Sequence, residues 1–91
     1  MKSYVLDQIA SIHEARELLG TILPGQRNPW LLLDIGGDPI AYFDLIETDI
    51  DVHGPSVIAN ISGRHYNEDG KVVAVLHRLQ AVVGGKIVYA P

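Results

Sequence analysis

The sequence predicts an α+β two-layer sandwich in which two helices pack on a mostly antiparallel sheet of four to five strands. Two segments carry apolar side chains at helical spacing, and short β-prone runs precede, separate and follow them. Glycine pairs at 36–37 and 84–85 mark turns between these segments. Because the chain has 91 residues, residues 1–91 are predicted to form a single domain.

The first helix is predicted from a capping signal followed by an apolar stripe. Ser11 precedes Glu14 by three positions, the capping-box spacing, so a helix should begin near Ile12. Residues 1–6 are short and partly β-prone, and we expect them to form a first strand or an ordered tail. The helix should end at Pro24-Gly25, after an apolar stripe made of Ile12, Ala15, Leu18, Leu19, Ile22 and Leu23.

A hairpin is predicted next. Residues 29–35 and 40–46 are apolar runs of strand length, and the glycines at 36–37 supply the positive φ angles that a short turn needs. The two runs should therefore pair antiparallel. Pro39 has no backbone N–H, so we expect it at the start of the second strand or at an outer edge.

The C-terminal half is predicted to contain a strand, a helix and a closing strand. Residues 56–64 alternate with period two, as in a strand covered on one face, and residues 67–70 supply turn chemistry before a helical stripe over 72–83. The glycines at 84–85 end this helix, and residues 86–90 are predicted to be a strand. The order is (β)αβββαβ. A ferredoxin-like βαββαβ arrangement follows if residues 1–6 are a strand and one of the three central runs is merely extended.

The composition excludes several classes of protein. No apolar stretch approaches the roughly 20 residues that span a bilayer, and the N-terminus lacks a basic segment followed by an apolar one. Without Cys, the chain has no disulfide framework and no thiolate metal site, which agrees with a reducing cytoplasm. We therefore expect a cytoplasmic protein that neither spans a membrane nor holds a cofactor.

Acidic side chains are concentrated in the middle third of the sequence. The net charge is −4, yet residues 30–62 contain no Lys or Arg. If the strands and the loop in this region lie side by side, their carboxylates form one negative surface. The alternative is that acidic loops keep a small protein soluble and protect an exposed strand edge from aggregation. The carboxylates are Asp34, Asp38, Asp44, Glu47, Asp49 and Asp51.

The leading functional interpretation is a non-catalytic interaction module that offers an acidic surface to a basic protein. A toxin-neutralising immunity or inhibitor protein is one example, because a nucleic-acid-cleaving toxin has a positive cleft that carboxylates can fill. A nucleic acid is disfavoured as the main partner, since phosphate binding needs a basic stripe. The neighbouring rings of Tyr42 and Phe43 must point to opposite faces of a strand, so whichever points outward is the anchor candidate. The predicted partner-binding residues are Asp44, Glu47, Asp49 and Asp51, with Tyr42 or Phe43.

A second interpretation is a small-molecule or metal-binding domain with weak enzymatic activity. Asp49, Asp51 and His53 are spaced i, i+2 and i+4, which in an extended segment places three ligands for a divalent ion on one face. His65 would complete this set. The pattern lacks the central glycine and terminal glutamate of an EF-hand, so a solvated acidic loop is the competing interpretation.

Basic side chains also suggest an anion site. Arg64, His65 and the later Arg78 would form it, because an arginine binds carboxylate or phosphate and an imidazole titrates near neutrality. His77, on the second predicted helix, is expected to face solvent. No Ser, Thr or Cys lies in a recognisable nucleophile motif, so we do not expect an enzyme.

A third interpretation is a structural homodimer. Its sheet edges would pair across a two-fold axis. So short a chain buries a modest core and would gain buried surface by association.

Overall fold

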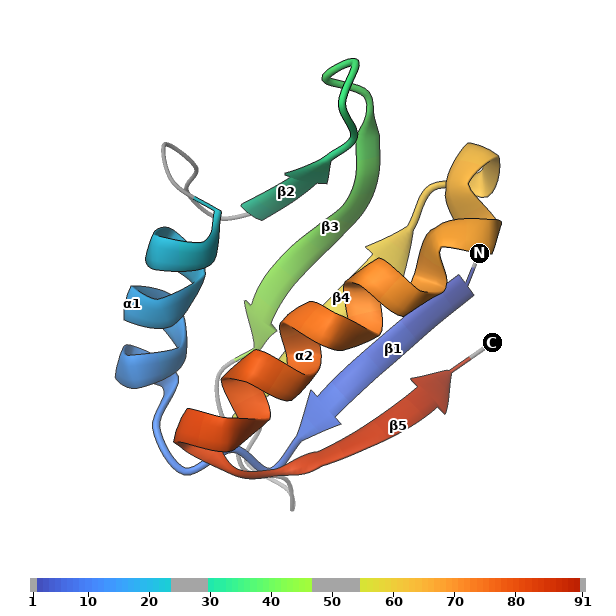
Figure 1. Ribbon diagram of the computed structural model, residues 1–91. Coiled ribbons are helices and arrows are strands. Elements are labelled where there is room, and N and C mark those ends of the chain that lie inside the picture. The colour runs from blue at the N-terminus through green and yellow to red at the C-terminus, as the bar shows by residue number, and fades with distance from the viewer. Residues whose placement is uncertain (1, 24–29, 47–54, 91) are drawn as a thin grey trace.

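Five strands form one antiparallel sheet, and two helices pack on the same face of it (Figure 1). The computed structural model describes residues 2–23, 30–46 and 55–90. In chain order, the elements are β1 (Lys2–Asp7), α1 (Ile12–Ile22), β2 (Trp30–Leu33), β3 (Pro39–Ile46), β4 (Ser56–Ile61), the 3₁₀ helix η1 (Gly63–Glu68), α2 (Asp69–Val83) and β5 (Lys86–Ala90). The predicted fold class and element order are confirmed.

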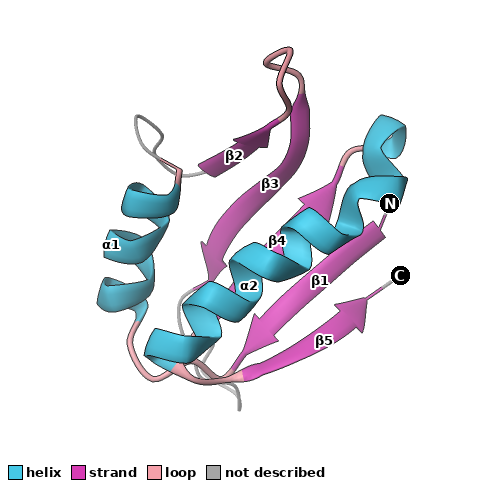
Figure 2. Cartoon of the chain, viewed as in Figure 1, coloured by secondary structure: helices cyan, strands magenta, loops and turns pink. Residues whose placement is uncertain are grey.

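The strand order in the sheet is β2-β3-β4-β1-β5, so the first strand lies between the last two (Figure 2). Strands β3-β4-β1-β5 and the two helices have the order of the ferredoxin-like βαββαβ arrangement, and β2 adds a strand outside β3. Residues 1–6 were predicted to be a strand or a tail, and β1 shows that they contribute a strand. All three central runs are strands, where the ferredoxin-like prediction allowed for only two.

The buried core lies between the sheet and the helices. Along β4, Val57, Ala59 and Ile61 are buried, as their predicted alternation requires. The register places Phe43 opposite Ala59 and Leu6 opposite Val57, so these side chains share the covered face. The helices bury Ala15, Leu19, Val72, Val75, Leu76, Leu79 and Val83 against this face.

The first helix begins as the capping signal predicts. The backbone N–H of Glu14 donates to the Ser11 hydroxyl oxygen at 3.2 Å, and Ile12 is the first residue of α1. At the other end, the backbone N–H of Leu23 donates to the Leu19 carbonyl at 2.8 Å. A local side-chain contact therefore sets where α1 starts.

Two predicted strands are shorter in the structure, each because the chain turns earlier. The run at residues 29–35 forms β2 only as far as Leu33, since the backbone N–H of Asp34 donates to the Asp38 carbonyl at 2.9 Å and closes the hairpin. The run at 56–64 ends as β4 at Ile61, because the N–H of His65 donates to the Ser62 carbonyl and η1 begins. Pro39 is the first residue of β3, as predicted.

Gly85 joins α2 to β5 where no side chain fits. Its φ angle is +95°, and a Cβ atom there would lie 2.6 Å from the Asp7 backbone carbonyl oxygen. We expect Gly85→Ala to lower the free energy of unfolding by about 1–3 kcal/mol, measured by urea denaturation. Gly20→Ala is the matched control: a Cβ at Gly20 of α1 has nothing within 4 Å, so it should stabilise by about 0.5–1 kcal/mol. Equal effects of the two substitutions would contradict this account.

Candidate functional site

One face of the sheet carries side chains that the helices do not cover. These residues alternate along their strands with residues of the core and therefore point to the opposite side. Within the described part of the chain, both helices lie on the other face (Figure 2). We call this surface the open face; it consists of Ser3, Val5, Asp7, Leu31, Tyr42, Asp44, Ile46, Ser56, Ile58, Asn60, Lys86 and Val88.

Strand register joins most of the open-face residues into two rows across the sheet. In one row Leu31 lies opposite Tyr42, and Tyr42 lies opposite Asn60. Asn60 in turn lies opposite Ser3, whose hydroxyl donates to the Asn60 side-chain oxygen at 2.6 Å. This hydrogen bond ties β1 to β4 on the uncovered side of the sheet.

The second row is mostly apolar. Asp44 lies opposite Ile58, Ile58 opposite Val5, and Val5 opposite Val88. Ile46 follows Asp44 by two positions on β3 and so points the same way. Tyr42, Ile46 and Val88 are 40%, 42% and 41% exposed, which leaves apolar surface on two strands, β3 and β5, in contact with solvent.

The structure decides which of the two neighbouring aromatic residues can anchor a partner. Tyr42 lies on the open face, whereas Phe43 is completely buried in the core opposite Ala59 and Trp30. The candidate contact residue Phe43 is therefore corrected to a core residue. Asp44 lies on the open face and is half-buried. The predicted partner-binding residues Glu47, Asp49 and Asp51 fall outside the described residues.

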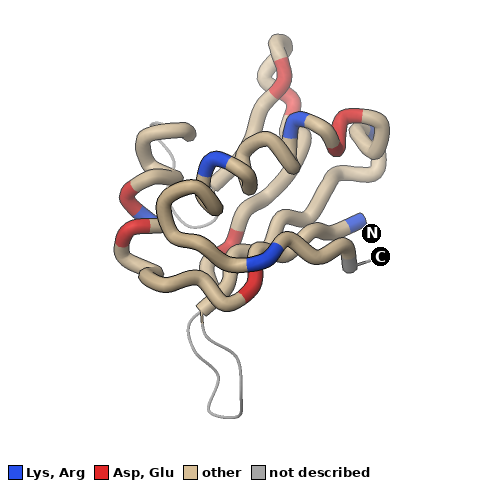
Figure 3. Tube along the Cα trace, turned by 60° about the horizontal axis from the view of Figure 1, so that its bottom comes forward, with Lys and Arg blue, Asp and Glu red and all other residues tan. Residues whose placement is uncertain are grey.

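The acidic residues of the middle third that the structure describes, Asp34, Asp38 and Asp44, do not gather in one patch. Acidic positions are spread along the described trace (Figure 3). Asp34 and Asp38 lie in the turn that precedes β3, whereas Asp44 lies near the far end of that strand. Asp38 is also paired with a cation, since the Arg64 guanidinium donates to its Oδ1 at 2.7 Å. The expected single negative surface is therefore divided among the residues that the structure describes.

His65 is the centre of an ion-pair network between the β2–β3 turn and the start of α2. Its Nε2 lies 2.6 Å from Asp38 Oδ2 and 4.0 Å from Asp34 Oδ2, and its Nδ1 contacts Glu68 Oε2. The imidazole is only 12% exposed. Lys71 completes the network by donating to Glu68 Oε1 at 2.9 Å. We call these residues, together with Arg64, the His65 network.

The contacts of the His65 network shift three pKa values in consistent directions. Hydrogen bonds to Asp38 and Glu68 raise the pKa of His65 above its ordinary value. The hydrogen bond from His65, with the nearby Arg64 charge, lowers the pKa of Asp38. Hydrogen bonds from Lys71 and His65 lower the pKa of Glu68. Each shift favours the charged form of its group.

The His65 network contains a group of possible metal ligands and two residues of the predicted anion site. Ligand atoms of Asp34, Asp38 and His65 lie within 4.8 Å of one another, a spacing that a divalent ion can bridge. However, His65 and Arg64 already neutralise Asp38, so we assign these groups to an ion-pair network. Of the anion site predicted at Arg64, His65 and Arg78, the first two side chains bind a carboxylate of the protein, that of Asp38.

The remaining candidates lie elsewhere. Arg78 is exposed further along α2, and His77 is exposed beside it, as predicted. The proposed metal ligands Asp49, Asp51 and His53 lie outside the described residues. His65 lies in η1, after the end of β4.

A second polar junction connects β1 to the start of α2. The Lys2 ammonium and the Tyr4 hydroxyl both donate to Asp69 Oδ2 at 2.9 Å. These hydrogen bonds lower the pKa of Asp69 and raise the pKa values of Lys2 and Tyr4. Asp69 is the first residue of α2, where a negative charge also interacts favourably with the helix dipole. No sequence motif indicated this contact, because its partners are far apart along the chain.

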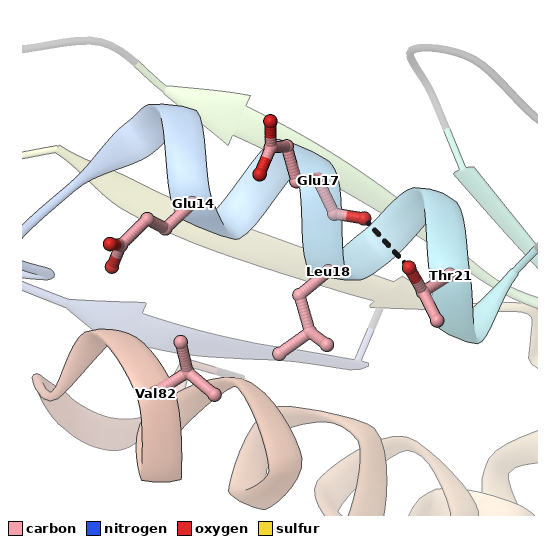
Figure 4. A pocket seen from close by; sticks show the side chains of 5 residues that line it. All are labelled: Glu14, Glu17, Leu18, Thr21 and Val82. Atoms are coloured by element: carbon pink, nitrogen blue, oxygen red, sulfur yellow. Dashed lines mark hydrogen bonds between the residues drawn. The ribbon is translucent and has the colours of Figure 1, made fainter.

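A shallow groove of 340 Å³ runs between the two helices, on the side away from the sheet. Leu18 and Val82 line it with apolar surface, and Glu14 and Glu17 contribute carboxylates (Figure 4). The Thr21 hydroxyl donates to the backbone carbonyl of Glu17 at 3.2 Å. The groove is wide open, and its apolar lining is the contact line of two packed helices.

The chain was compared with protein families, curated proteins and solved structures. No protein-family profile, no curated protein and no solved structure matches the chain. Among the helices of the described residues, none has the length and apolar character needed to cross a bilayer.

The two neighbouring rings of β3 should differ sharply in their contribution to stability. Phe43→Ala should lower the free energy of unfolding by about 3–5 kcal/mol, because it empties a fully buried site. Tyr42→Ala removes a ring that is 40% exposed and should cost less than about 1.5 kcal/mol. Urea denaturation of both variants measures the difference. A cost for Tyr42→Ala equal to that for Phe43→Ala would place Tyr42 in the core and remove it from the open face.

Proposed function

We propose that this protein is a non-catalytic interaction module that binds a basic protein through its open face. The observation that carries the proposal is the juxtaposition of an exposed aromatic ring, Tyr42, with the Asp44 carboxylate on an apolar sheet face that the described helices leave uncovered. Apolar surface shared by several strands marks an interaction site more often than isolated exposed residues do.

The aromatic and aliphatic side chains supply the contact area. A tyrosine gives a large, rigid surface with a polar hydroxyl at its tip, and such residues dominate the binding energy of many interfaces. Tyr42 lies near the middle of β3, between Leu31 on β2 and Asn60 on β4. It is therefore surrounded by further open-face residues, the position in which an anchor is best shielded from water.

Charge complementarity supports a basic partner. Asp44 places a carboxylate among the apolar residues of the open face, next to Ile58. The chain that follows β3 carries Glu47, Asp49 and Asp51, and residues 30–62 contain no Lys or Arg. Such an arrangement attracts a positively charged protein at long range and disfavours acidic competitors. A stoichiometric inhibitor of a nucleic-acid-cleaving enzyme would use these features, because the substrate cleft of its target is positively charged.

The titratable groups of the His65 network have a structural role in this proposal. His65, Asp38 and Glu68 bind one another, so these side chains stabilise the end of the hairpin. The proposal therefore assigns no reaction to them. It also assigns no metal or cofactor, and it places the protein in the cytoplasm, in keeping with the absence of Cys.

Affinity capture with matched variants tests the role of the open face. Tagged wild-type protein is exposed to a lysate of its native cells at low and at moderate salt, beside Tyr42→Ala, Asp44→Asn and the control Val82→Ala. Val82 is 55% exposed on α2, on the opposite side of the molecule. A basic protein that binds through the open face should be lost with the first two variants and kept with the control.

The captured protein is then purified and its affinity is measured. Tyr42→Ala should raise the dissociation constant by about tenfold or more, and the affinity of the wild type should fall as salt increases. Binding that is indifferent to ionic strength and to both open-face substitutions would overturn the proposal.

The molar mass in solution distinguishes the homodimer alternative from the basic-partner proposal. Light scattering at micromolar concentration should give the mass of one chain, 9.9 kDa. A dimer that Tyr42→Ala dissociates would assign the open face to a second copy of this chain and would refute the basic-partner proposal.

A further inference from the structure

The contacts of His65 require a protonated imidazole. Nε2 faces the Asp38 carboxylate at 2.6 Å, and Nδ1 faces the Glu68 carboxylate. A carboxylate only accepts hydrogen bonds, whereas a neutral imidazole has a single N–H to donate. Both contacts are therefore satisfied together only when each ring nitrogen carries a proton.

The surrounding charges balance only in this protonated form. Three carboxylates face the ring: Asp34 and Asp38 from the β2–β3 turn, and Glu68 from η1. Arg64 of η1 binds Asp38, and Lys71 of α2 binds Glu68. A protonated His65 is the third cation of this group. When it loses its proton, one nitrogen becomes an acceptor that faces a carboxylate oxygen, and that contact becomes repulsive.

We propose that His65 is a protonation-dependent clasp that joins the β2–β3 turn to η1 and α2. Among the described contacts, two side chains of η1 bridge to Asp38 in the turn: the His65 imidazolium and the Arg64 guanidinium. Beside it, the backbone N–H of Ser62 donates to the Ile40 carbonyl at 2.9 Å. Loss of the proton weakens the bridge, so the turn opens more often while the rest of the sheet stays folded.

The direction of the pH dependence follows from the shifted pKa values. The pKa of His65 is raised in the folded protein, so its contribution is complete below the ordinary value of 6.5 and is lost as pH rises through the folded value. The pKa values of Asp38 and Glu68 are lowered, so their contributions are present above the ordinary values of 3.8 and 4.5 and are lost in acid. The clasp is therefore strongest between about pH 4.5 and 6.5.

The clasp has a consequence for the open face that rests on the proposed function. The hairpin carries Leu31 on β2 and Tyr42 on β3. Opening of its turn would loosen the end of the hairpin next to the part of the surface that includes the anchor. Partner binding should therefore be strongest under mildly acidic conditions and should weaken as pH rises above 6.5, the ordinary pKa of His65.

Hydrogen exchange of the protein without any partner tests the clasp. The amides of Asp34, Gly37 and Ser62 donate to backbone carbonyls in and beside the turn, so their protection factors report its opening. In the wild type these factors should fall by up to about tenfold for each pH unit between the ordinary and the raised pKa of His65. Amides of the β1–β4 ladder should change less.

Two histidine variants separate the clasp from a general effect of pH. His65→Gln should have low, pH-independent protection at the turn, whereas His77→Gln, which alters an exposed histidine of α2, should behave like the wild type. Unchanged wild-type protection from pH 6 to pH 9, or the same pH dependence in His65→Gln, would overturn the proposal.

The ring itself gives a reading that needs no variant. Nitrogen chemical shifts of the wild-type imidazole at pH 6.5, the ordinary pKa of a histidine, should show that both His65 nitrogens are mostly protonated. A single protonated nitrogen on His65 at that pH would refute the clasp. Neither measurement involves a partner, so failure of the clasp is distinguishable from failure of the proposed function.

Discussion

The fold depends on burial of apolar side chains on one face of a twisted antiparallel sheet. Along each strand, successive side chains point to opposite faces, so a strand that supplies Phe43 or Ala59 to the core must present Tyr42 or Asn60 on the other side. Two α-helices cover the core face, and the described residues contain no further α-helix. The open face is thus the direct geometric counterpart of the core.

The N-terminal end of α2 is held to the sheet by polar contacts in addition to the buried Val72. The His65 network binds this end to the β2–β3 turn, and Asp69 binds it to Lys2 and Tyr4 of β1. The His65 network engages Asp38, which the sequence alone would assign to the negative surface. Asp44 remains available beside exposed Tyr42 on β3, which is why the proposed interface centres on that strand.

Local patterns predicted the elements well, since they depend on contacts within a few residues. Ser11 caps α1 through Glu14, and Pro39 begins β3 because it has no N–H to donate. The candidate site was less predictable. Alternation required that Tyr42 and Phe43 face opposite ways, but it did not say which ring the helices cover. His65 was selected for its chemistry, yet its partner Asp38 is 27 residues away.

The sequence by itself determined the order of helices and strands, the turn positions, and the two sets of side chains that each strand separates. Those properties follow from backbone geometry and from the spacing of apolar residues. The tertiary structure alone decided which set is covered, how the acidic residues are divided and that His65 sits among three carboxylates. These outcomes depend on which strands become neighbours and on which side the helices pack. Both depend on the apolar surface that the whole chain buries, so no single segment of the sequence determines them.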